Sequence, residues 1–423
     1  VMEHRNRNGI AAWWIAWTCL AMFFATSQAA SSAEANTAKT AETETIARCG
    51  KGWLERVNGV FVLHLAGSPY EMGYQHGALL KEHARANLAH ILDEQMAKKT
   101  ITIAGFQLGP QSILGAVIKT QDKHIPKWYS DELIGLADGA EVPLERARRA
   151  NFVPELFHCS GFAVMNSATA DGVLYHGRVL DYAVDWRLQE HAVIIVHRPD
   201  GAIPWVNVTF AGFIGCVTGM NAQQISLGEM GGGGLGHWDG VPMAVLMRWA
   251  LREAKTLDEA VAVFRDNPRT CQYFYVAADG KTNRAVGFEA SAGKFQQLGP
   301  GEKNSLLPRP VKDAVLLSAG DRYNCLVDRV QKSHGRIDQQ RALKLMDRGV
   351  AMKSNLQNVL FAPKSTRFWV SYAGKDRTPA ADRPYQAFQL TELLQREPDA
   401  DAPRLPLPEQ SARRVPSSPK QGE

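Results

Sequence analysis

The fold is decided by the stretch His158-Cys159-Ser160-Gly161-Phe162-Ala163-Val164, followed by Ala170-Asp171-Gly172 and by Tyr175-His176-Gly177-Arg178-Val179-Leu180-Asp181-Tyr182. Two apolar runs joined by an Asp-Gly turn predict a pair of β-strands. A cysteine heads the first strand, and an arginine and an aspartate lie near the end of the second. Because Arg178 and Asp181 are three residues apart, they reach one face together only if the chain bends or bulges between Gly177 and Leu180.

The composition is that of a soluble globular protein: 45% of the 423 residues are hydrophobic and 22% are charged. The formal net charge of +5 is small for this length, and the basic residues are scattered, so no nucleic-acid partner is expected. The twelve histidines are dispersed, and neither Cys-x-x-Cys nor His-Glu-x-x-His occurs. We therefore expect no metal and no cofactor.

Residues 1–30 have the features of a secretory signal peptide. Arg5 and Arg7 precede an apolar run from residue 10 to residue 25, and small residues suited to cleavage follow it. An uncleaved amino-terminal anchor is the alternative, and no second apolar run of membrane length follows. The expected location is periplasmic or extracellular, without a stable membrane span.

The rest of the chain divides by composition and periodicity into four parts. Residues 31–58 predict a mobile leader, 59–158 a mainly helical segment, 159–396 a catalytic domain of short strands and helices, and 397–423 a disordered tail. Strands are expected at 59–65, 175–180, 191–197, 205–210, 213–218, 224–227, 272–277, 284–289, 314–318 and 367–372, and helices at 70–98, 112–136, 242–255, 257–265 and 338–347. This pattern indicates an α+β fold.

Residues 231–236 match G-x-G-x-x-G, but residues 237–241 separate them from the next expected helix. A dinucleotide-binding loop opens directly into its helix, so a flexible loop at the border of a functional site is favoured.

Five cysteines lie beyond the expected signal peptide, and an odd number in an exported chain indicates at least one free thiol. Cys159 is the candidate for that thiol. A cysteine nucleophile needs a base, and His158 cannot serve within a strand because adjacent side chains point to opposite faces. If the His158-Cys159 peptide bond is cut, Cys159 gains an α-amino group with a pKa of about 8, close to the value of about 8.5 for its own thiol. One residue then carries both nucleophile and base.

Several motifs in this order resemble one known family. They are Cys159-Ser160, Gly177-Arg178-Val179-Leu180-Asp181-Tyr182, Gly219-Met220-Asn221 with Glu229, the upstream element Gly67-Ser68-Pro69-Tyr70-Glu71-Met72-Gly73-Tyr74-Gln75-His76-Gly77, and the late Ser354-Asn355-Leu356. The chain resembles the autoproteolytic N-terminal nucleophile (Ntn) hydrolases, specifically the acyl-CoA:6-aminopenicillanic acid acyltransferase family, which is related to choloylglycine hydrolases and to N-acylethanolamine and ceramide amidases.

The resemblance implies a four-layer αββα sandwich and cleavage between His158 and Cys159, with the two fragments of one precursor staying associated. It makes Cys159 the nucleophile, places Arg178 beside the thiolate and assigns Asp181 to the new α-amino group. A guanidinium beside the sulfur predicts a thiol pKa below the ordinary cysteine value.

The resemblance extends to two further residues. Asn221 is suited to donate to the oxyanion, and Glu229 matches a position near the cleavage and substrate site. The late asparagine of the related amidases has no clear match. Asn324, Arg322 and Arg329 are candidates to replace it.

The activity implied is hydrolysis of a small linear amide, such as an N-acyl amine, an N-acyl amino acid or a peptide-like amide, through a thioester on Cys159. Acyl transfer of the acyl-CoA:6-aminopenicillanic acid type and a non-catalytic exported binding protein are the alternatives. Each site residue also has a structural alternative: a buried inert thiol at Cys159, an ion pair of Arg178 with Asp181, a turn at Asn221 and a structural carboxylate at Glu229.

Overall fold

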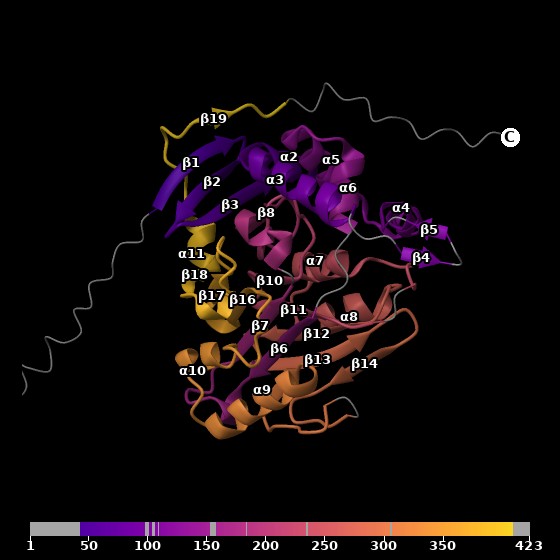
Figure 1. Ribbon diagram of the computed structural model, residues 1–423. Coiled ribbons are helices and arrows are strands. Elements are labelled where there is room, and N and C mark those ends of the chain that lie inside the picture. Colours follow the sequence, from indigo (N-terminus) through magenta and orange to yellow (C-terminus); the bar gives the residue numbers. More distant parts are fainter. Residues whose placement is uncertain are drawn as a thin grey trace, which may run out of the picture. The chain divides into compact units, whose positions relative to one another are not determined.

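The computed structural model describes residues 43–97, 101–103, 106–108, 110–152, 158–182, 184–233, 236–304 and 307–408 (Figure 1). They belong to one unit that begins at Thr43. The expected signal peptide, residues 1–30, lies outside the described residues.

Eleven strands form the larger sheet, in the order β14-β13-β12-β11-β10-β9-β8-β3-β2-β1-β19. Neighbouring strands are antiparallel, except that β3 pairs with β8 and β1 with β19 in parallel. The strands are β1 (Thr43–Cys49), β2 (Gly52–Val57), β3 (Val60–Gly67), β8 (Ala192–Pro199), β9 (Trp205–Phe210), β10 (Thr218–Asn221), β11 (Ile225–Gly231), β12 (Tyr273–Asp279), β13 (Arg284–Ala290), β14 (Phe295–Leu298) and β19 (Arg404–Leu405). Strands from before and after Cys159 thus share one sheet.

Six antiparallel strands form the second sheet, in the order β15-β6-β7-β16-β17-β18. They are β6 (His158–Val164), β7 (Tyr175–Asp181), β15 (Ala314–Leu317), β16 (Asn355–Ala362), β17 (Arg367–Tyr372) and β18 (Gln386–Gln389), and a separate pair is formed by β4 (Ile101–Ile103) and β5 (Phe106–Leu108). The pairing of β6 with β7 confirms the two strands predicted on either side of the Asp-Gly turn.

The two sheets pack face to face and helices cover their outer faces. Alternation along β12 shows this arrangement: Val276 and Ala278 pack toward β6, whereas Tyr275 and Ala277 pack toward α7 (Met243–Glu253) and α8 (Leu257–Asp266). The outer face of the second sheet is covered by α9 (Gly320–Ser333) and α10 (Gln339–Lys344), seen in orange in Figure 1. The layers therefore run helix, sheet, sheet, helix, which confirms the predicted αββα order.

Further helices surround the part of the larger sheet that precedes Cys159. They are α2 (Pro69–Leu79), α3 (Lys81–Ala89), α4 (Pro110–Gln121), α5 (Lys127–Ala140) and α6 (Leu144–Phe152), and α11 (Leu390–Gln395) contacts β8 and β18. Short 3-10 and π segments join several of these elements. They are η1 (His90–Gln95), η2 (Asp122–His124), η3 (Asn166–Ala168), η4 (Val184–Trp186), η5 (Leu188–His191), η6 (Pro363–Ser365) and η7 (Ala380–Asp382). Within the described part of the chain, no helix combines the length and the apolar character needed to cross a membrane.

The upstream motif that carries the family resemblance forms α2, and its glycines allow close packing. Ser68 caps the helix in a capping box with Glu71. Gly73 and Gly77 face α5 so closely that a Cβ at Gly73 would lie 2.0 Å from the Glu132 carbonyl oxygen. A larger side chain at either position would force α2 and α5 apart, which explains why this motif needs glycine.

Two predicted boundaries are wrong in the described residues. The mobile leader was expected up to residue 58, but β1 and β2 occupy residues 43–57. The disordered tail was expected from residue 397, but Arg404 and Leu405 pair with β1. The polar composition of these segments did not predict strands. Short strands near a sheet edge are stabilised more by pairing with their neighbours than by their own composition. The strand expected at residues 59–65 is confirmed as β3 of the larger sheet.

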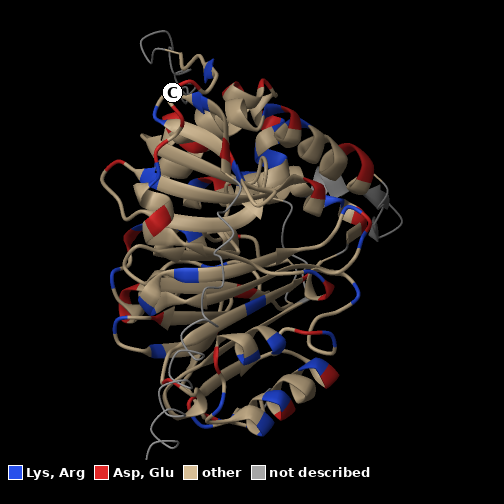
Figure 2. Cartoon of the chain, turned by 90° about the vertical axis from the view of Figure 1, so that its left-hand side faces the viewer, with Lys and Arg blue, Asp and Glu red and all other residues tan. Residues whose placement is uncertain are grey.

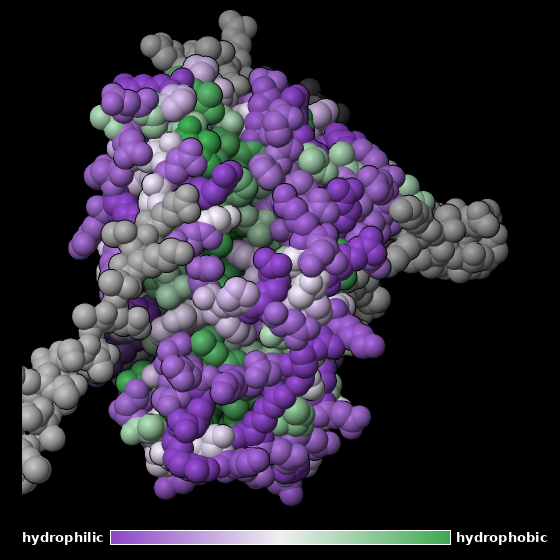
Figure 3. Space-filling view, turned by 60° about the vertical axis from the view of Figure 1, so that its left-hand side comes forward, coloured by the Kyte–Doolittle hydropathy of each residue, from purple (hydrophilic) through white to green (hydrophobic). Residues whose placement is uncertain are grey.

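The surface is mostly polar. Figure 2 shows charged residues of both signs, many of them on loops and helices, while most strand surfaces carry other residues. Figure 3 shows one face that is largely hydrophilic, with small hydrophobic areas between the polar side chains. Among the described residues, the large hydrophobic side chains that are exposed are Ile134, Leu144 and Met352.

Candidate active site

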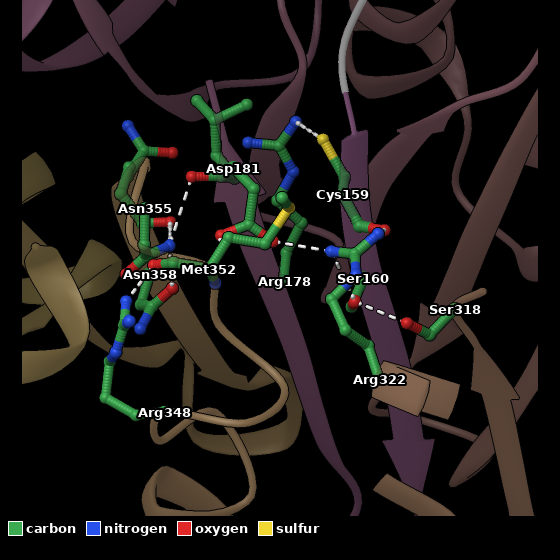
Figure 4. A network of polar contacts seen from close by, with 12 residues as sticks. Cys159, Ser160, Arg178, Asp181, Ser318, Arg322, Arg348, Met352, Asn355 and Asn358 are labelled. Atoms are coloured by element: carbon green, nitrogen blue, oxygen red, sulfur yellow. Dashed lines mark hydrogen bonds and ion pairs between the residues drawn. The ribbon is translucent and has the colours of Figure 1, made fainter. Parts of the chain in front are cut away.

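Cys159 is the second residue of β6, and its side chain points into the space between the sheets. Its register partner on β7 is Leu180, and Gly161, on the same face, lies against Met230 of β11. Cys159 is only 5% exposed. Because side chains alternate along a strand, the face of β7 that carries Leu180 also carries Arg178. The register of β6 with β7 therefore brings thiol and guanidinium together (Figure 4).

Arg178 is fully buried and contacts the thiol directly. Its Nη2 donates to the Cys159 Sγ at 3.4 Å and to Glu229 Oε2 at 3.4 Å, and its Nε donates to the Glu229 main-chain oxygen at 3.1 Å. Gly228 makes room for this side chain, since a Cβ there would lie 2.9 Å from the Arg178 Cγ. The structure thus places Arg178 and Glu229 beside Cys159.

Glu229 lies on β11 and is also fully buried. Burial raises its pKa to about 7, although Arg178 opposes the rise. Its Oε1 has no hydrogen-bond partner among the described residues. A carboxyl group that exchanges its proton near neutral pH therefore shares the guanidinium that contacts the thiol.

We expect Glu229→Gln to remove a pH dependence of stability. The folded state binds this proton more tightly than the unfolded state, so the contribution to the free energy of unfolding is complete below pH 4.5 and is lost as the pH rises to about 7. Urea unfolding across this window should show wild type losing stability with rising pH relative to Glu229→Gln.

Glu289→Gln is the matched control for this measurement. Burial alone would raise the pKa of Glu289, but hydrogen bonds from Lys294 and Gln272 lower it overall. The Glu289→Gln protein should therefore still lose stability between pH 4.5 and 7, as wild type does. A stability difference between wild type and Glu229→Gln that is constant across the window would contradict the raised pKa.

The thiol itself differs from the sequence-based expectation. Burial raises the pKa of Cys159 to about 12; Arg178 opposes the rise, while Glu229 and Asp181 add to it. The expected net lowering by Arg178 is wrong for the continuous chain. Removing the sulfur from water disfavours the thiolate more than one guanidinium favours it, and this guanidinium is shared with Glu229.

Asp181 ends β7 and points to the opposite face of the sheet, toward α9. Its Oδ1 accepts from the Met352 main-chain N–H at 2.9 Å and its Oδ2 accepts from Arg322 Nη1 at 2.6 Å. Burial raises the pKa of Asp181, and the Met352 N–H and Arg322 oppose the rise. The expected bend in β7 is absent, because its register with β6 is unbroken. Arg178 and Asp181 instead flank the start of β6 from its two faces.

Arg322 is the residue of α9 that joins this cluster. Its Nη1 donates to the Ser160 hydroxyl at 3.3 Å, its Nη2 contacts the Cys159 main-chain oxygen at 3.5 Å, and Ser160 shares a 2.7 Å hydrogen bond with Ser318 (Figure 4). Arg329 instead donates to main-chain oxygens near the end of α10, and Asn324 accepts from Arg309. Of the three candidates for the late position, the structure brings Arg322 to Cys159.

Asn221 is not at this site. Its Nδ2 donates to two main-chain oxygens at the end of α7, at 3.0 and 2.8 Å, and its Oδ1 accepts from two main-chain N–H groups of the following turn. That turn leads into Ile225 at the start of β11, whereas Gly231 beside the thiol ends this strand, roughly 20 Å away at about 3.3 Å per residue. The expected oxyanion role of Asn221 is therefore wrong, because its side chain is fully used in holding a turn.

No histidine hydrogen-bonds to the Cys159 sulfur among the described side chains. The contacts to this sulfur come from Arg178 and from the main-chain N–H of Gly231. His176 shares the face of β7 that carries Arg178, but it is fully buried and bonds to the Ser226 hydroxyl at 2.8 Å. The base for this thiol must have another source.

A cavity of about 350 Å³ opens beside Cys159, a size suited to a small-molecule ligand. Its apolar wall consists of Met230, Phe274, Phe288, Leu298, Leu307 and Leu317. Ser318 and Arg322 add polar groups near the thiol, and Glu289, Gln296 and Asn304 add others. Gly231 also lines the cavity, so the described start of the glycine-rich loop borders the site.

Fold and site together define an αββα sandwich with a cysteine buried against an arginine at the edge of a small-molecule pocket. The family model "Acyl-coenzyme A:6-aminopenicillanic acid acyl-transferase" matches residues 169–304, a segment that begins after Cys159 and includes Arg178, Asp181 and Glu229. This match, over part of the chain, shows similarity to the acyl-CoA:6-aminopenicillanic acid acyltransferase family that the sequence motifs resemble.

Similar proteins come from several organisms. Protein dcd1B of Dictyostelium discoideum is 25% identical over 389 residues, which cover 82% of this chain and 77% of that protein. The N-acylethanolamine-hydrolyzing acid amidase of Mus musculus is 25% identical over 193 residues, which cover 42% of this chain and 52% of the amidase. The solved Caenorhabditis elegans ortholog of that amidase superposes with a TM-score of 0.38 at 18% identity, covering 49% of this chain and 93% of its own.

Proposed function

We propose that this protein is an exported amidase that cuts its own chain between His158 and Cys159 and then hydrolyses small N-acyl amides through a thioester on Cys159. One observation carries the proposal: the buried thiol contacts Arg178 and borders a 350 Å³ cavity, yet none of its described side-chain contacts is a histidine. A free α-amino group on Cys159 would supply the missing base. The similarity to N-acylethanolamine-hydrolyzing amidases supports the N-acyl amide class, and residues 1–30 support export.

The chain-cutting step consumes one water molecule. The Cys159 sulfur attacks the carbonyl carbon of His158, the peptide C–N bond breaks, and the thiol proton ends on the departing nitrogen. Water then hydrolyses the thioester, which leaves a carboxylate on His158 and restores the thiol. The products are a new carboxyl end and a Cys159 that carries both thiol and α-amine.

In the cut enzyme the same groups serve substrate turnover. The α-amine takes the thiol proton, the thiolate attacks the amide carbon, and the protonated amine gives its proton to the leaving nitrogen. Arg178 stabilises the sulfur anion, Asp181 holds the α-amino group, and the Gly231 N–H beside the sulfur is placed to donate to the oxyanion. Water then releases the acid from the thioester.

The architecture supports continued association of the two fragments. The part before Cys159 would keep β1, β2 and β3 in the larger sheet, with β3 hydrogen-bonded along its length to β8. A buried ion pair between Glu132 of α5 and Arg248 of α7 also joins the two parts. Separation would expose both, so we expect the fragments to copurify.

Turnover without acyl-CoA tests hydrolysis against acyl transfer. We expect the purified protein to release octanoate from N-octanoyl amides in buffer alone, and a brief acid quench to show an octanoyl group on the Cys159 fragment by mass spectrometry. Cys216→Ala, which removes another buried thiol, should retain both signals. Release that requires added acyl-CoA, or acyl label on another residue, would contradict the proposal.

A further inference from the structure

Arg322 lies beside the candidate nucleophile and lines the same cavity. Its guanidinium bonds to Asp181 and Ser160 and contacts the Cys159 main-chain oxygen. It also lines the cavity, with 18% of its side chain exposed, whereas Arg178 is fully enclosed. Arg322 is therefore the arginine of this cluster that a bound molecule can reach.

Part of the Arg322 guanidinium is available to a ligand. Its Nη1 makes both short contacts, to Asp181 at 2.6 Å and to Ser160 at 3.3 Å, while its Nη2 makes one long contact of 3.5 Å. No hydrogen bond from its Nε is found among the described residues. The planar fork of arginine suits two parallel hydrogen bonds to a carboxylate.

The charges at the site also favour a negatively charged ligand. In the continuous chain Arg322 is matched by Asp181, Arg178 by Glu229, and Lys294 by Glu289. Cutting the chain adds an α-amino group at Cys159 close to Asp181. While the thiol keeps its proton, the cationic form of this group leaves one positive charge without a counter-ion in a largely buried site. A negatively charged ligand would compensate that charge.

We infer that Arg322 binds the carboxylate of the leaving group, so that the preferred substrates are N-acyl amino acids rather than neutral N-acyl amines. The inference rests on the proposed amidase function. The α-carboxylate of such a substrate is separated by one carbon from the nitrogen that leaves, and Arg322 contacts the backbone of the nucleophile itself. The apolar wall of the cavity then holds the acyl chain.

A matched substrate pair tests this inference. N-octanoylglycine and N-octanoylglycinamide differ only in carboxylate against amide, and we expect wild type to prefer the acid. Arg322→Gln keeps a donor for Asp181 but removes the charge, so it should lower the preference by about 10- to 100-fold, mainly through KM for the acid. Arg322→Lys should retain part of the preference, and the control Lys127→Met, which removes an exposed cation paired with Asp131 on α5, should leave it unchanged.

Binding measured without turnover separates this inference from the amidase proposal. N-octylsulfonylglycine and its neutral glycinamide counterpart resist attack by a thiol, and calorimetry gives their affinities for wild type and Arg322→Gln. Selective loss of affinity for the acid supports the inference even in a protein that hydrolyses nothing. Equal loss for both compounds, or no preference for the acid in wild type, would overturn it and leave Arg322 as a positioning residue for Asp181.

Discussion

Cys159→Ala is expected to remain a single chain with no amidase turnover, whereas wild type is cut and active. Without the sulfur there is no group in β6 to attack the carbonyl of His158, and without the cut there is no α-amine to act as base. The turnover rate should fall by roughly 10⁴-fold or more, as for other nucleophile deletions. Gel electrophoresis and octanoate release on the same preparations measure both losses.

Two controls make this comparison specific. Cys216→Ala removes another fully buried thiol and should be cut and active like wild type. Cys159→Ser keeps a weaker nucleophile at the same atom and should be cut slowly. A Cys159→Ala protein that is still cut at the same bond would show that another group attacks His158.

Arg178→Ala is expected to impair both the chemistry and the fold. The fully buried guanidinium contacts the thiol and bonds to Glu229, so its removal leaves a buried carboxyl group without its partner. Loss of one member of a buried ion pair costs about 3–5 kcal/mol of unfolding free energy. The thiolate loses its stabilising charge as well, and we expect chain cutting and turnover to slow by at least about 10²-fold.

A second variant separates stability from chemistry at Arg178. Arg178→Met together with Glu229→Gln removes both charges and retains most of the side-chain volume, so urea unfolding should show stability near that of wild type. Chain cutting and turnover should stay slow in this double variant. Recovery of both would mean that Arg178 acts only by supporting the fold.

The strand pair that carries the thiol was predictable because its signal is local. Two apolar runs around Asp171-Gly172 specify two paired strands, and antiparallel pairing then places Arg178 on the face that carries Cys159. Gly177 was one reason to expect a bend in this strand. A Cβ at this position would lie 2.2 Å from the Phe162 ring. Close packing, rather than a change of direction, explains that glycine.

The errors arose where the deciding contacts are distant in sequence. Helix α9, which brings Arg322 to Asp181, was not predicted, although its buried residues Tyr323, Leu326, Val327 and Val330 follow helical spacing. Strand β16, which borders β7, was indicated only by the family resemblance at Ser354-Asn355-Leu356. A strand was expected at residues 213–218, but β10 begins only at Thr218. Asn221 matched a short motif, and its position at the far end of β11 follows only from the sheet. The thiol pKa depends on burial from both sheets, which no local pattern reports.

Denaturing mass spectrometry of the purified wild-type protein, with amino-terminal sequencing, shows whether the chain is cut between His158 and Cys159. We expect two polypeptides that copurify, one ending at His158 and the other beginning at Cys159. A single uncut chain that nevertheless hydrolyses N-acyl amides would contradict this expectation, because the thiol would then have a base other than its own α-amine.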